Sequence, residues 1–529
     1  MAKNFYLCPH WITNEKNILM FKNHPKGLLG AALSNMGERF GFYIMMAILS
    51  LFLMSKFGLE KTQATIIYSV FYALIYLLAL AGGVIADRTK KYKQTILAGI
   101  VLMAIGYLLI AIPTPTPVPD LTLYLTLTCL GLFVIAFGNG LFKGNLQAVV
   151  GQMYDNPKYS AKRDTGFQLF YMFINVGGLF APLIAVAIRN LWVESKGFLY
   201  NSDLPALCHQ FINGTITPEA TERFTNLASE VSTAAPVTDL TTFANSYLDI
   251  FNTGFHYAFG FAIVAMMISL TIYLINKKKF PDPAAKKLAK GDAQAIQMDT
   301  KEIKQRLYAL FAVFAVVIFF WFSFHQNGVT LTFFANDYTN LSKFSINLGF
   351  VTLKGAELFQ MFNPFFVVFL TPVVIAFFGW LKARGKEPST PRKIAIGMGI
   401  AALAFVVMAL GSQGLPDADT VKAMGGLADS ARVTPFLLIG TYFILTVAEL
   451  FISPLGLSFV SKVAPPHLQG VMQGCWLGAT ALGNQLLFIG TIFYESIPIW
   501  LTWCVFVAAC LISMFTMLCM VKWLERVAK

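Results

Sequence analysis

The chain has 529 residues, of which 56% are hydrophobic, and it carries a formal net charge of +13 at pH 7. Its mean hydropathy is +0.63, well above that of a soluble globular protein. This composition excludes an ordinary soluble domain and predicts a protein that crosses a membrane repeatedly.

Twelve apolar stretches are each long enough to cross a hydrocarbon core about 30 Å thick. An even number of spans places both termini on one side of the membrane. The N-terminal tail, the even-numbered connections and the C-terminal tail hold most of the 40 Lys and Arg residues. The positive-inside rule therefore predicts cytoplasmic termini, and the positive charge needs no nucleic acid to explain it. The expected spans lie at approximately 29–55, 63–86, 94–112, 121–150, 166–192, 255–276, 307–335, 357–381, 394–412, 434–461, 468–493 and 497–521.

The spans divide six and six around a polar, basic connection, an arrangement typical of the major-facilitator fold, in which the substrate site lies between the halves at the membrane midplane. Two outer segments, 193–254 and 413–433, are long for simple connections. We interpret the first as a small extracytoplasmic cap or a loosely ordered loop, and favour a solvated loop for both. The expected segments are 1–28 (cytoplasmic), 29–276 (first half), 277–306 (cytoplasmic linker with a surface helix), 307–521 (second half) and 522–529 (cytoplasmic tail).

Charged side chains lie within the first span. Glu38 and Arg39 share one helical face with Asn35, Tyr43 and Met46. A carboxylate and a guanidinium at bilayer depth are costly, at about 2.5–3.5 kcal/mol for Arg on insertion scales, so they normally face a bundle interior or a wet cavity. This face is therefore a candidate functional surface.

A lysine, Lys143, lies in the glycine-rich fourth span. Its ammonium group needs a partner, and Glu38 and Glu449 are the carboxylates at comparable depth. A carboxylate that alternates between a salt bridge and a protonated state can carry a proton. A static structural ion pair is the alternative interpretation of each charge.

The second span ends in GGVIADRTKKYKQ, in which Gly82 and Gly83 permit a close approach of a neighbouring helix and Asp87 and Arg88 follow at the cytoplasmic end. This segment resembles the major-facilitator signature between the second and third spans, which closes the inner gate through charge and helix-end contacts. An ordinary basic cytoplasmic loop is the alternative.

Longer motifs narrow the interpretation further. They are GERFGFY in the first span, GNGLFKGNLQAVVGQMY at 138–154, FYMFINVGG at 170–178, FNPFFVVFLTPV at 362–373 and AELFISPLGLSFVSKVAPPHLQGVMQGCWLGATALGN at 448–484. In this order and spacing they resemble the proton-dependent oligopeptide transporter family of the major facilitators, of which the chain looks like a divergent member.

The resemblance implies roles for matching residues. Glu38 and Arg39 match the end of the family's E-x-x-E-R motif, which couples proton movement to gating, and Lys143 matches the lysine that pairs with it. Glu449 and Ser453 match residues that hold the peptide's amino terminus. The residues that match or resemble the lining of the peptide cavity are Tyr43, Tyr76, Asn175, Trp321 and Asn363.

Four residues depart from the family's pattern, and one of them, Ala79, replaces a proline of the second span. Asn35 replaces the first Glu of E-x-x-E-R, and Met46 replaces the Arg that grips the peptide carboxylate. His325 stands where the family usually has an acidic residue of the outer gate, and it could relay protons, contact an anion, gate the cavity or simply pack there. Losing the cation at Met46 removes about 1.5–3 kcal/mol of peptide binding unless Arg39, Lys143 or His325 substitutes.

The sequence thus predicts an all-helical inner (plasma) membrane transporter that imports di- or tripeptides, or peptide-like solutes, with protons. Proton carriage is expected at Glu38, Glu449 and His325, with Arg39 and Lys143 as switching partners. We expect a functional monomer that needs no cofactor besides the coupling proton. No metal-ligand cluster, nucleophile elbow or phosphate-binding loop stands in the sequence, so an enzyme is not expected. The alternatives are a carrier of a modified amino acid, a sugar derivative or an anion with altered coupling, and a non-transporting sensor or scaffold.

Overall fold

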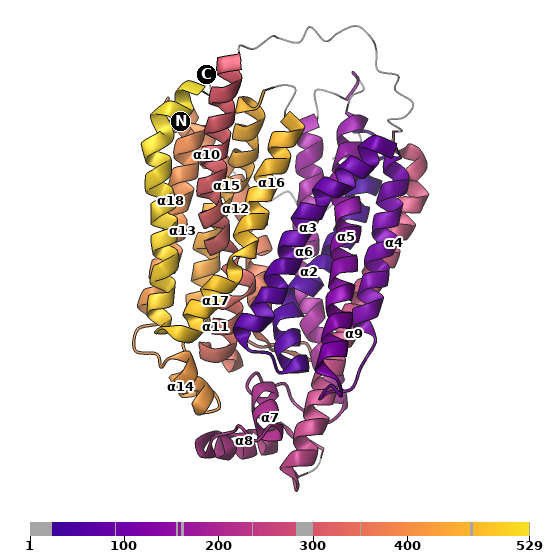
Figure 1. Cartoon of the computed structure of the whole chain (residues 1–529), viewed down its shortest axis with the longest axis vertical. Coiled ribbons are helices and arrows are strands. Elements are labelled where there is room, and N and C mark those ends of the chain that lie inside the picture. The colour runs from indigo at the N-terminus through magenta and orange to yellow at the C-terminus, as the bar shows by residue number, and fades with distance from the viewer. Residues whose placement is uncertain are drawn as a thin grey trace, which may run out of the picture.

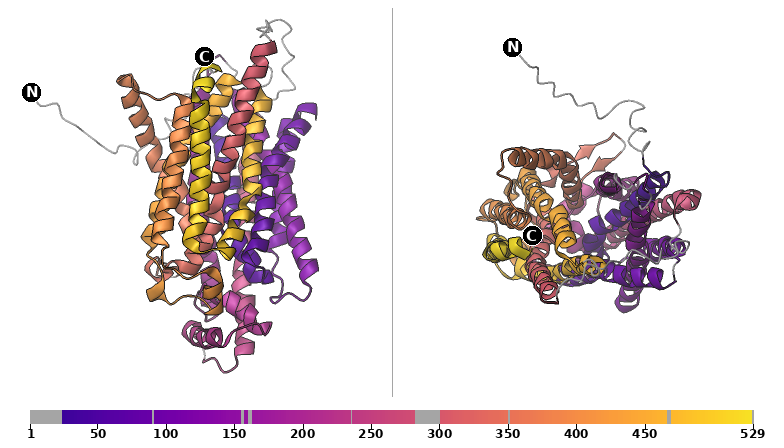
Figure 2. Two further views of the ribbon diagram at one scale, coloured as in Figure 1. Left: turned by 60° about the vertical axis from the view of Figure 1, so that its left-hand side comes forward. Right: turned by 90° about the horizontal axis from the view of Figure 1, so that it is seen from above.

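A computed structural model describes residues 24–89, 91–154, 157–159, 163–234, 236–281, 300–349, 351–465 and 469–527. In this part of the chain, twelve helical stretches are long and apolar enough to cross a membrane. The helices form two groups that stand side by side, the first half in indigo to magenta and the second in rose-red through orange to yellow (Figures 1 and 2). The expected twelve-span fold with two halves is confirmed.

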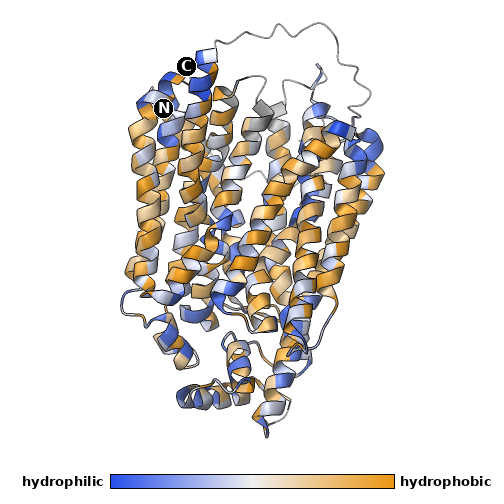
Figure 3. Ribbon diagram, viewed as in Figure 1, coloured by the Kyte–Doolittle hydropathy of each residue, from blue (hydrophilic) through white to orange (hydrophobic). Residues whose placement is uncertain are grey.

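The first half consists of six long helices. They are α2 (Leu28–Phe57), α3 (Lys61–Thr89), α4 (Tyr92–Ala111), α5 (Leu121–Met153), α6 (Arg163–Ser195) and α9 (Leu240–Asn276), which continues into the 3-10 turn η2 (Lys277–Lys279). Apolar residues cover the sides of these helices, and polar residues gather at their ends (Figure 3). Because α2 packs against both α6 and α9, its polar face lies inside the bundle.

The second half also has six spans, two of which are interrupted. The first is α10 (Thr300–Phe324), η4 (His325–Gly328) and α11 (Thr330–Tyr338), and the other interrupted span is α16 (Gln469–Gln485) with α17 (Leu487–Ser496). The uninterrupted spans are α12 (Phe362–Ala383), α13 (Thr390–Gly411), α15 (Pro435–Val463) and α18 (Ile499–Val527). The two halves meet where α3 contacts α16 and α17, and where α6 contacts α12.

Small elements connect the helices of the second half at the end of the bundle that the distribution of Lys and Arg predicts to be the outer one. Between α11 and α12 lie η5 (Leu341–Lys343), the antiparallel strands β1 (Ile346–Asn347) and β2 (Thr352–Leu353), and η6 (Ala356–Met361). Between α13 and α15 lie α14 (Ala418–Ala423) and η7 (Asp429–Ala431). The expected solvated loop at 413–433 is therefore partly helical.

The outer segment of the first half is an ordered cap, not the favoured solvated loop. It contains α7 (Leu204–Ile212) and α8 (Pro218–Val231), and α9 begins at Leu240, well before the expected position 255. The helix starts have sequence signals that a hydropathy reading overlooks: Thr217 accepts from the Ala220 N–H, and Asp239 accepts from the Thr241 and Thr242 N–H groups. In Figure 1, α7 and α8 lie beyond the end of the bundle opposite the C-terminal end of α18.

The linker expected at 277–306 is shorter than predicted, because α10 already begins at Thr300. The surface helix expected there falls on residues 282–299, which lie outside the described part of the chain.

Glycines let α3 and α5 approach closely. A Cβ atom at Gly82 would lie 2.1 Å from the carbonyl oxygen of Gly140, so both positions require glycine. Gly83, which we expected to share this role, has no neighbour within 4 Å of such an atom, so the close approach depends on Gly82 alone of this pair.

Candidate substrate and proton-coupling site

The charged pair of the first span is buried and fully engaged. The Arg39 Nε and Nη2 atoms each donate to a Glu38 carboxylate oxygen at 2.6 Å, and the two side chains are 4% and 1% exposed. Asn139 of α5 donates from Nδ2 to Glu38 Oε1 at 2.6 Å. The Arg39 guanidinium also lies 4.3 Å from the centre of the Phe42 ring. One carboxylate thus receives three charge-assisted or polar hydrogen bonds in a site screened from water.

Lys143 does not pair with Glu38 in this conformation. Its Nζ atom lies over the Tyr76 ring, 4.5 Å from the ring centre, and no ion pair joins it to a carboxylate within the described residues. Because Arg39 and Asn139 already donate to the Glu38 carboxylate, the Lys143 ammonium lies on the electron-rich face of the Tyr76 ring instead. The expected ion pair would form only if Glu38 exchanged its partner.

On the facing half, Glu449 of α15 is held by α12. Asn363 donates from Nδ2 to Glu449 Oε2 at 2.8 Å and to Thr446 Oγ1 at 3.1 Å. Thr446 is the residue one helical turn before Glu449, so the amide bridges α12 to one face of α15. The structure therefore brings two predicted site residues, Glu449 and Asn363, into direct contact.

Tyr43 joins the polar groups of the two halves. A Cβ atom at Gly178 of α6 would lie 3.1 Å from the Tyr43 ring and 3.5 Å from Pro364 of α12. Glu449 also lies within electrostatic range of Tyr43 and Tyr76. The carboxylate of the second half and the tyrosines of the first half consequently face one common region.

An aromatic ladder continues this region toward the outer side. Tyr68, Tyr72 and Tyr76 follow one another on α3 at ring separations of 5.9 and 5.8 Å. Tyr72 lies 5.0 Å from the His325 ring, which in turn stacks on Trp321 at 5.0 Å and 14°. His325 and Trp321 therefore lie together against α3, at the point where α10 gives way to η4.

Several polar atoms of this region lack hydrogen-bond partners within the described chain. They are His325 Nδ1, Trp321 Nε1, Asn35 Nδ2 and both amide atoms of Asn484 in α16. Asn484 is the polar neighbour of His325, and all four side chains are buried. Buried polar groups normally find partners; His325 and Asn484 face each other, and the Asn35 and Trp321 nitrogens are left for a polar ligand or water.

The remaining predicted residues take less specific positions. Met46 is buried in α2, and Ser453 is half-buried in α15. Asn175 donates to the Tyr171 carbonyl of its own helix at 3.3 Å. At the inner end of α3, Arg88 is exposed, and the Asp87 side chain lies outside the described part of the structure.

The sequence reading missed three polar residues of the site. Asn139 lies one helical turn before Lys143 in an apolar span, and Tyr72 lies one turn before Tyr76, so helical spacing could have identified both. Asn484 is the last residue of the motif at 448–484, and an amide side chain within an apolar span could have identified it.

The outer ends of the two halves are tied together by polar contacts. Arg189 of α6 forms a buried ion pair with Glu357 of η6, the two side chains being 1% and 0% exposed. Nearer the surface, Lys61 of α3 pairs with Asp337 of α11 at 3.2 Å, and Thr65 bonds to Thr491 of α17 at 3.0 Å. In this conformation the outer side is closed by contacts between the halves.

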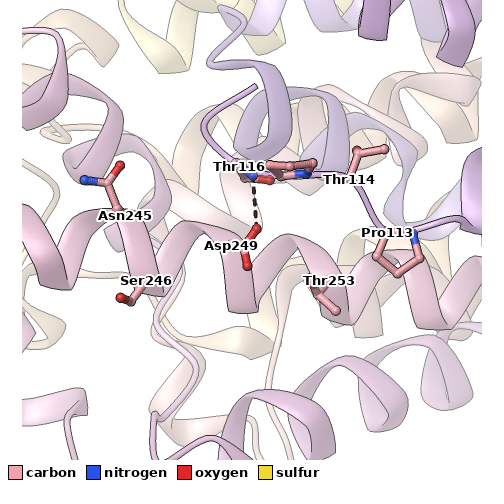
Figure 4. A pocket seen from close by; sticks show the side chains of 8 residues that line it. Pro113, Thr114, Thr116, Asn245, Ser246, Asp249 and Thr253 are labelled. Atoms are coloured by element: carbon pink, nitrogen blue, oxygen red, sulfur yellow. Dashed lines mark hydrogen bonds between the residues drawn. The ribbon is translucent and has the colours of Figure 1, made fainter. Parts of the chain in front are cut away.

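A separate surface pocket of about 560 Å³ lies on the first half, between the α4–α5 connection and α9. Its walls include Asp249, which accepts from the Thr116 N–H at 3.0 Å (Figure 4). The lining residues belong to one half only, so this pocket is distinct from the region between the halves. Among the described residues, no group of three or more His, Cys, Asp or Glu side chains could hold a metal ion.

Comparisons with known proteins agree with this architecture. The sequence profile of the POT family matches residues 93–291 and 284–498. The peptide transporter YePEPT of Yersinia enterocolitica is 29% identical over 496 residues, covering 89% of this chain and 88% of its own. The di-/tripeptide transporter of Lactococcus lactis subsp. cremoris is 27% identical, covering 88% and 89% respectively.

Solved structures show the same fold. A crystal structure of the peptide transporter POT in complex with sulfate superposes with a TM-score of 0.69 at 23% identity, covering 97% of this chain and 99% of that one. A POT family transporter in complex with 5-aminolevulinic acid gives a TM-score of 0.68 at 22% identity, with 96% and 97% covered. The profile match extends over most of the chain, and the helices, the fold and the buried polar region between the halves agree with it. The chain therefore belongs to the POT family and is a multi-pass membrane transporter, not an enzyme.

Proposed function

We propose that the protein imports di- and tripeptides, or closely peptide-like solutes, together with protons across the plasma (inner) membrane. The observation that carries this proposal is the Glu449–Asn363 pair, which the second half presents toward Tyr43 of the first. A buried carboxylate at a meeting point of two halves suits the ammonium group of a peptide. Ser453, one helical turn further on α15, adds a hydroxyl on the same helix face.

Lys143 takes the peptide's carboxylate in this proposal. Met46 carries no charge, and the Nε and Nη2 groups of Arg39 already donate to Glu38. The Lys143 ammonium rests on Tyr76 and has no carboxylate partner among the described residues, so it can turn to an incoming anion at low cost. His325, Trp321 and Asn175 would line the cavity around the peptide's side chains.

Proton coupling is assigned to Glu38 and Glu449. Protonation of Glu38 would release Arg39, and the guanidinium could then seek another partner. Asn35 leaves one carboxylate in this motif where two are usual, so a low proton-to-peptide ratio is expected. His325 supplies a further titratable group. The coupling ion is H+, and no cofactor is required.

Alternating access is the proposed transport cycle. The two halves would rock about the site between them, with Asp87 and Arg88 at the inner gate. One chain contains both halves, so a monomer is sufficient. Cytoplasmic termini are proposed from the distribution of Lys and Arg.

The test is uptake of labelled di-alanine into proteoliposomes, with and without an inward proton gradient. We expect gradient-stimulated uptake that Glu38→Gln abolishes, whereas Glu60→Gln, which removes an exposed carboxylate outside the site, retains it. Exchange without accumulation would mean that peptide binds but is not coupled to protons.

Competition by unlabelled solutes separates the remaining possibilities. Dipeptides should displace the label, whereas modified amino acids, sugar derivatives and inorganic anions should not. The departures at Met46 and His325 are the reason to include these solutes, although the relatives named above are peptide transporters. No uptake or exchange of any peptide by folded protein would refute the proposal, and no flux of any solute would indicate a sensor or scaffold.

A further inference from the structure

The cap of the first half also contacts the second half. We define the cap as residues 196–239, which contain α7 and α8, and the outer loop as residues 413–433 of the second half. The cap connects α6 to α9 within the first half, but α8 and α7 lie beside the outer loop. It therefore reaches across the outer side of the boundary between the two groups of helices.

Several contacts anchor the cap on the first half. His209 of α7 bonds through Nε2 to the Ser55 carbonyl, close to the end of α2, at 2.7 Å. The Phe224 ring of α8 lies 5.2 Å from Phe211 of α7 and 5.9 Å from Phe243 of α9. With these apolar contacts, α7, α8 and the start of α9 form one packed unit that is anchored on the first half.

A second set of contacts joins the cap to the outer loop. Thr217 donates from Oγ1 to the Ala423 carbonyl at 2.5 Å. Arg223 donates from Nε to the Gly425 carbonyl at 2.8 Å and from Nη2 to the Leu427 carbonyl at 2.7 Å. These acceptors are backbone groups of the second half, so the outer loop must keep this conformation for the contacts to form.

One carboxylate binds an arginine from each half. Asp203 of the cap accepts from Arg223 of the cap at 2.8 Å and from Arg432 of the outer loop at 2.5 Å, both at Oδ2. Asp203 and Arg432 are 8% and 4% exposed. Because water is largely excluded, these charge-assisted hydrogen bonds are stronger than exposed ion pairs.

The outer loop is shaped to receive the cap. Gly425 and Gly426 have φ angles of 71° and 106°, which side-chain-bearing residues rarely adopt. A Cβ atom at Gly425 would lie 2.9 Å from Leu207 and 3.2 Å from Ala220, and one at Gly426 would lie 2.6 Å from Asp203. A side chain at either position would therefore require the cap or the outer loop to shift.

We propose that the cap is a strap that holds the outer ends of the two halves together and releases the outer loop each time the transporter opens outward. The proposal rests on the alternating access proposed above, because a strap between halves matters only if the halves separate. It assigns Asp203 as the latch, since this side chain joins the charges of both halves. The alternative is a cap that stays bound to the outer loop throughout the cycle. It would show the same contacts in this structure, but the two segments would not separate when the outer side opens.

The main test is a reversible tether. In Ala220→Cys/Gly425→Cys, a disulfide would fix α8 to the outer loop, since the two Cβ positions lie 3.2 Å apart and a small shift brings them into disulfide range. We expect di-alanine uptake to fall at least about tenfold on oxidation and to return on reduction, while each single variant is unaffected by the same oxidant. Complete disulfide formation with unchanged uptake would overturn the proposal.

A readout without substrate separates this proposal from the proposed function. Hydrogen exchange of the outer segments 330–338 and 487–496 reports opening of the outer side whether or not peptide is carried. We expect slower exchange in the tethered protein, and unchanged exchange would overturn the strap. If the reduced protein carries no peptide but its exchange responds as expected, the proposed substrate fails and the strap stands.

A second variant avoids the disulfide and the strain of a side chain at Gly425. Asp203→Asn removes the charge but keeps an acceptor, and we expect exchange in the same two segments to rise about tenfold, as for loss of a hydrogen bond between charged groups. Native Cys208 is buried within the cap and serves as the folding control. It should stay unreactive toward a thiol reagent if the cap is still folded, and unchanged exchange under that condition would overturn the proposal.

Discussion

The buried ion pair between Arg189 and Glu357 should determine how firmly the outer side closes. Arg189 lies on α6 of the first half, and Glu357 lies on η6 of the second. Arg189 also donates to Asn190 Oδ1 at 3.0 Å and to the Lys354 carbonyl at 3.1 Å, and its guanidinium lies 4.2 Å from the centre of the Tyr200 ring. We predict that Glu357→Gln shifts the protein toward the outward-open state.

The magnitude follows from the burial of the pair. Removing one partner of a buried ion pair costs about 3–5 kcal/mol, because the remaining charge stays in a poorly solvated place. Gln keeps the size and one acceptor, and Asn190 and the Lys354 carbonyl still bind Arg189, so we take the lower end, about 3 kcal/mol. If the cost falls on the closed state, the ratio of open to closed protein rises about 100-fold.

Labelling of a buried position at the outer boundary measures this ratio. Thr65 is 0% exposed and bonds to Thr491 across the halves, so a cysteine there reacts only when the outer side opens. The labelling rate of Thr65→Cys by a membrane-impermeant maleimide is compared with and without Glu357→Gln. The labelling of the protein that retains Thr65 gives the contribution of the native cysteines, and this rate is subtracted.

A matched exposed pair provides the control. Lys422 of α14 and Glu60, which lies between α2 and α3, also join the halves, but they are 51% and 57% exposed. Glu60→Gln should therefore change the labelling rate less than about fivefold. If Glu357→Gln behaves like Glu60→Gln, the buried pair does not hold the outer side closed and the reasoning is wrong.

Three further predictions concern the coupling site, the substrate site and the cap. Asn139→Leu removes the 2.6 Å hydrogen bond to Glu38 and should lower proton-driven dipeptide uptake about tenfold or more; unchanged uptake would show that the bond is dispensable. Asn363→Ala should weaken binding of a dipeptide, measured by calorimetry, more than binding of its N-acetylated form, since the Glu449 carboxylate loses the donor that fixes its orientation; equal losses would contradict the assignment of the amino terminus. Burial holds the pKa of His209 below its ordinary value of about 6.5, so the neutral form stabilises the docked cap; this stability is present above that pH and is lost as the pH falls below it. Amide exchange of the cap should therefore quicken in acid beyond the intrinsic rate, and His209→Gln should remove this extra dependence.

Hydropathy and charge predicted the fold because both follow from the membrane itself. Each span must satisfy its backbone internally and present an apolar surface, so its signal is local to about 20 residues. Boundaries were predicted less well. The first half's sixth span begins at Leu240 because its outer turns pack against the cap, and an amphipathic extension outside the membrane has no long apolar run.

The cap shows what composition hides. Residues 193–254 are polar enough to suggest a solvated loop, but α8 buries Ala220, Phe224 and Val231 on one face. Spacings of four and seven residues are a helical pattern, and Thr217 before Pro218 is a capping signal. The contacts of the cap with the outer loop join residues about 200 positions apart, and no local pattern could have predicted them.

The candidate site was predicted as a set of residues, and its pairings were not. Motifs identified Glu38, Lys143 and Glu449, because charges stand out in apolar spans. They did not indicate that Asn139 would donate a hydrogen bond to Glu38 or that the Lys143 ammonium would lie on the Tyr76 ring. Which partner a buried charge takes depends on helix packing and on the conformation of the transporter, and neither is encoded in the spacing along one span.

The buried ion pair between the halves, Arg189 with Glu357, was not among the expected site residues. With Met46 in α2 and His325 in η4, the chain lacks an arginine and a carboxylate at the two positions where its family's pattern suggests them. In this structure those positions hold a buried methionine and a stacked imidazole, while Arg189 and Glu357 form the buried pair between the halves. Among the described residues, no cation lies over the rings of Tyr68, Tyr72 or Trp321, whereas the Lys143 ammonium lies over Tyr76. A neutral region above Glu449 and Lys143 favours peptides with apolar or uncharged side chains, because a charged side chain there would lack a counterion. In competition against labelled di-alanine, dipeptides with a Lys or Glu residue should therefore bind at least about tenfold more weakly than those with Ala or Leu. Equal inhibition by all four would mean that the ladder does not contact the peptide's side chains.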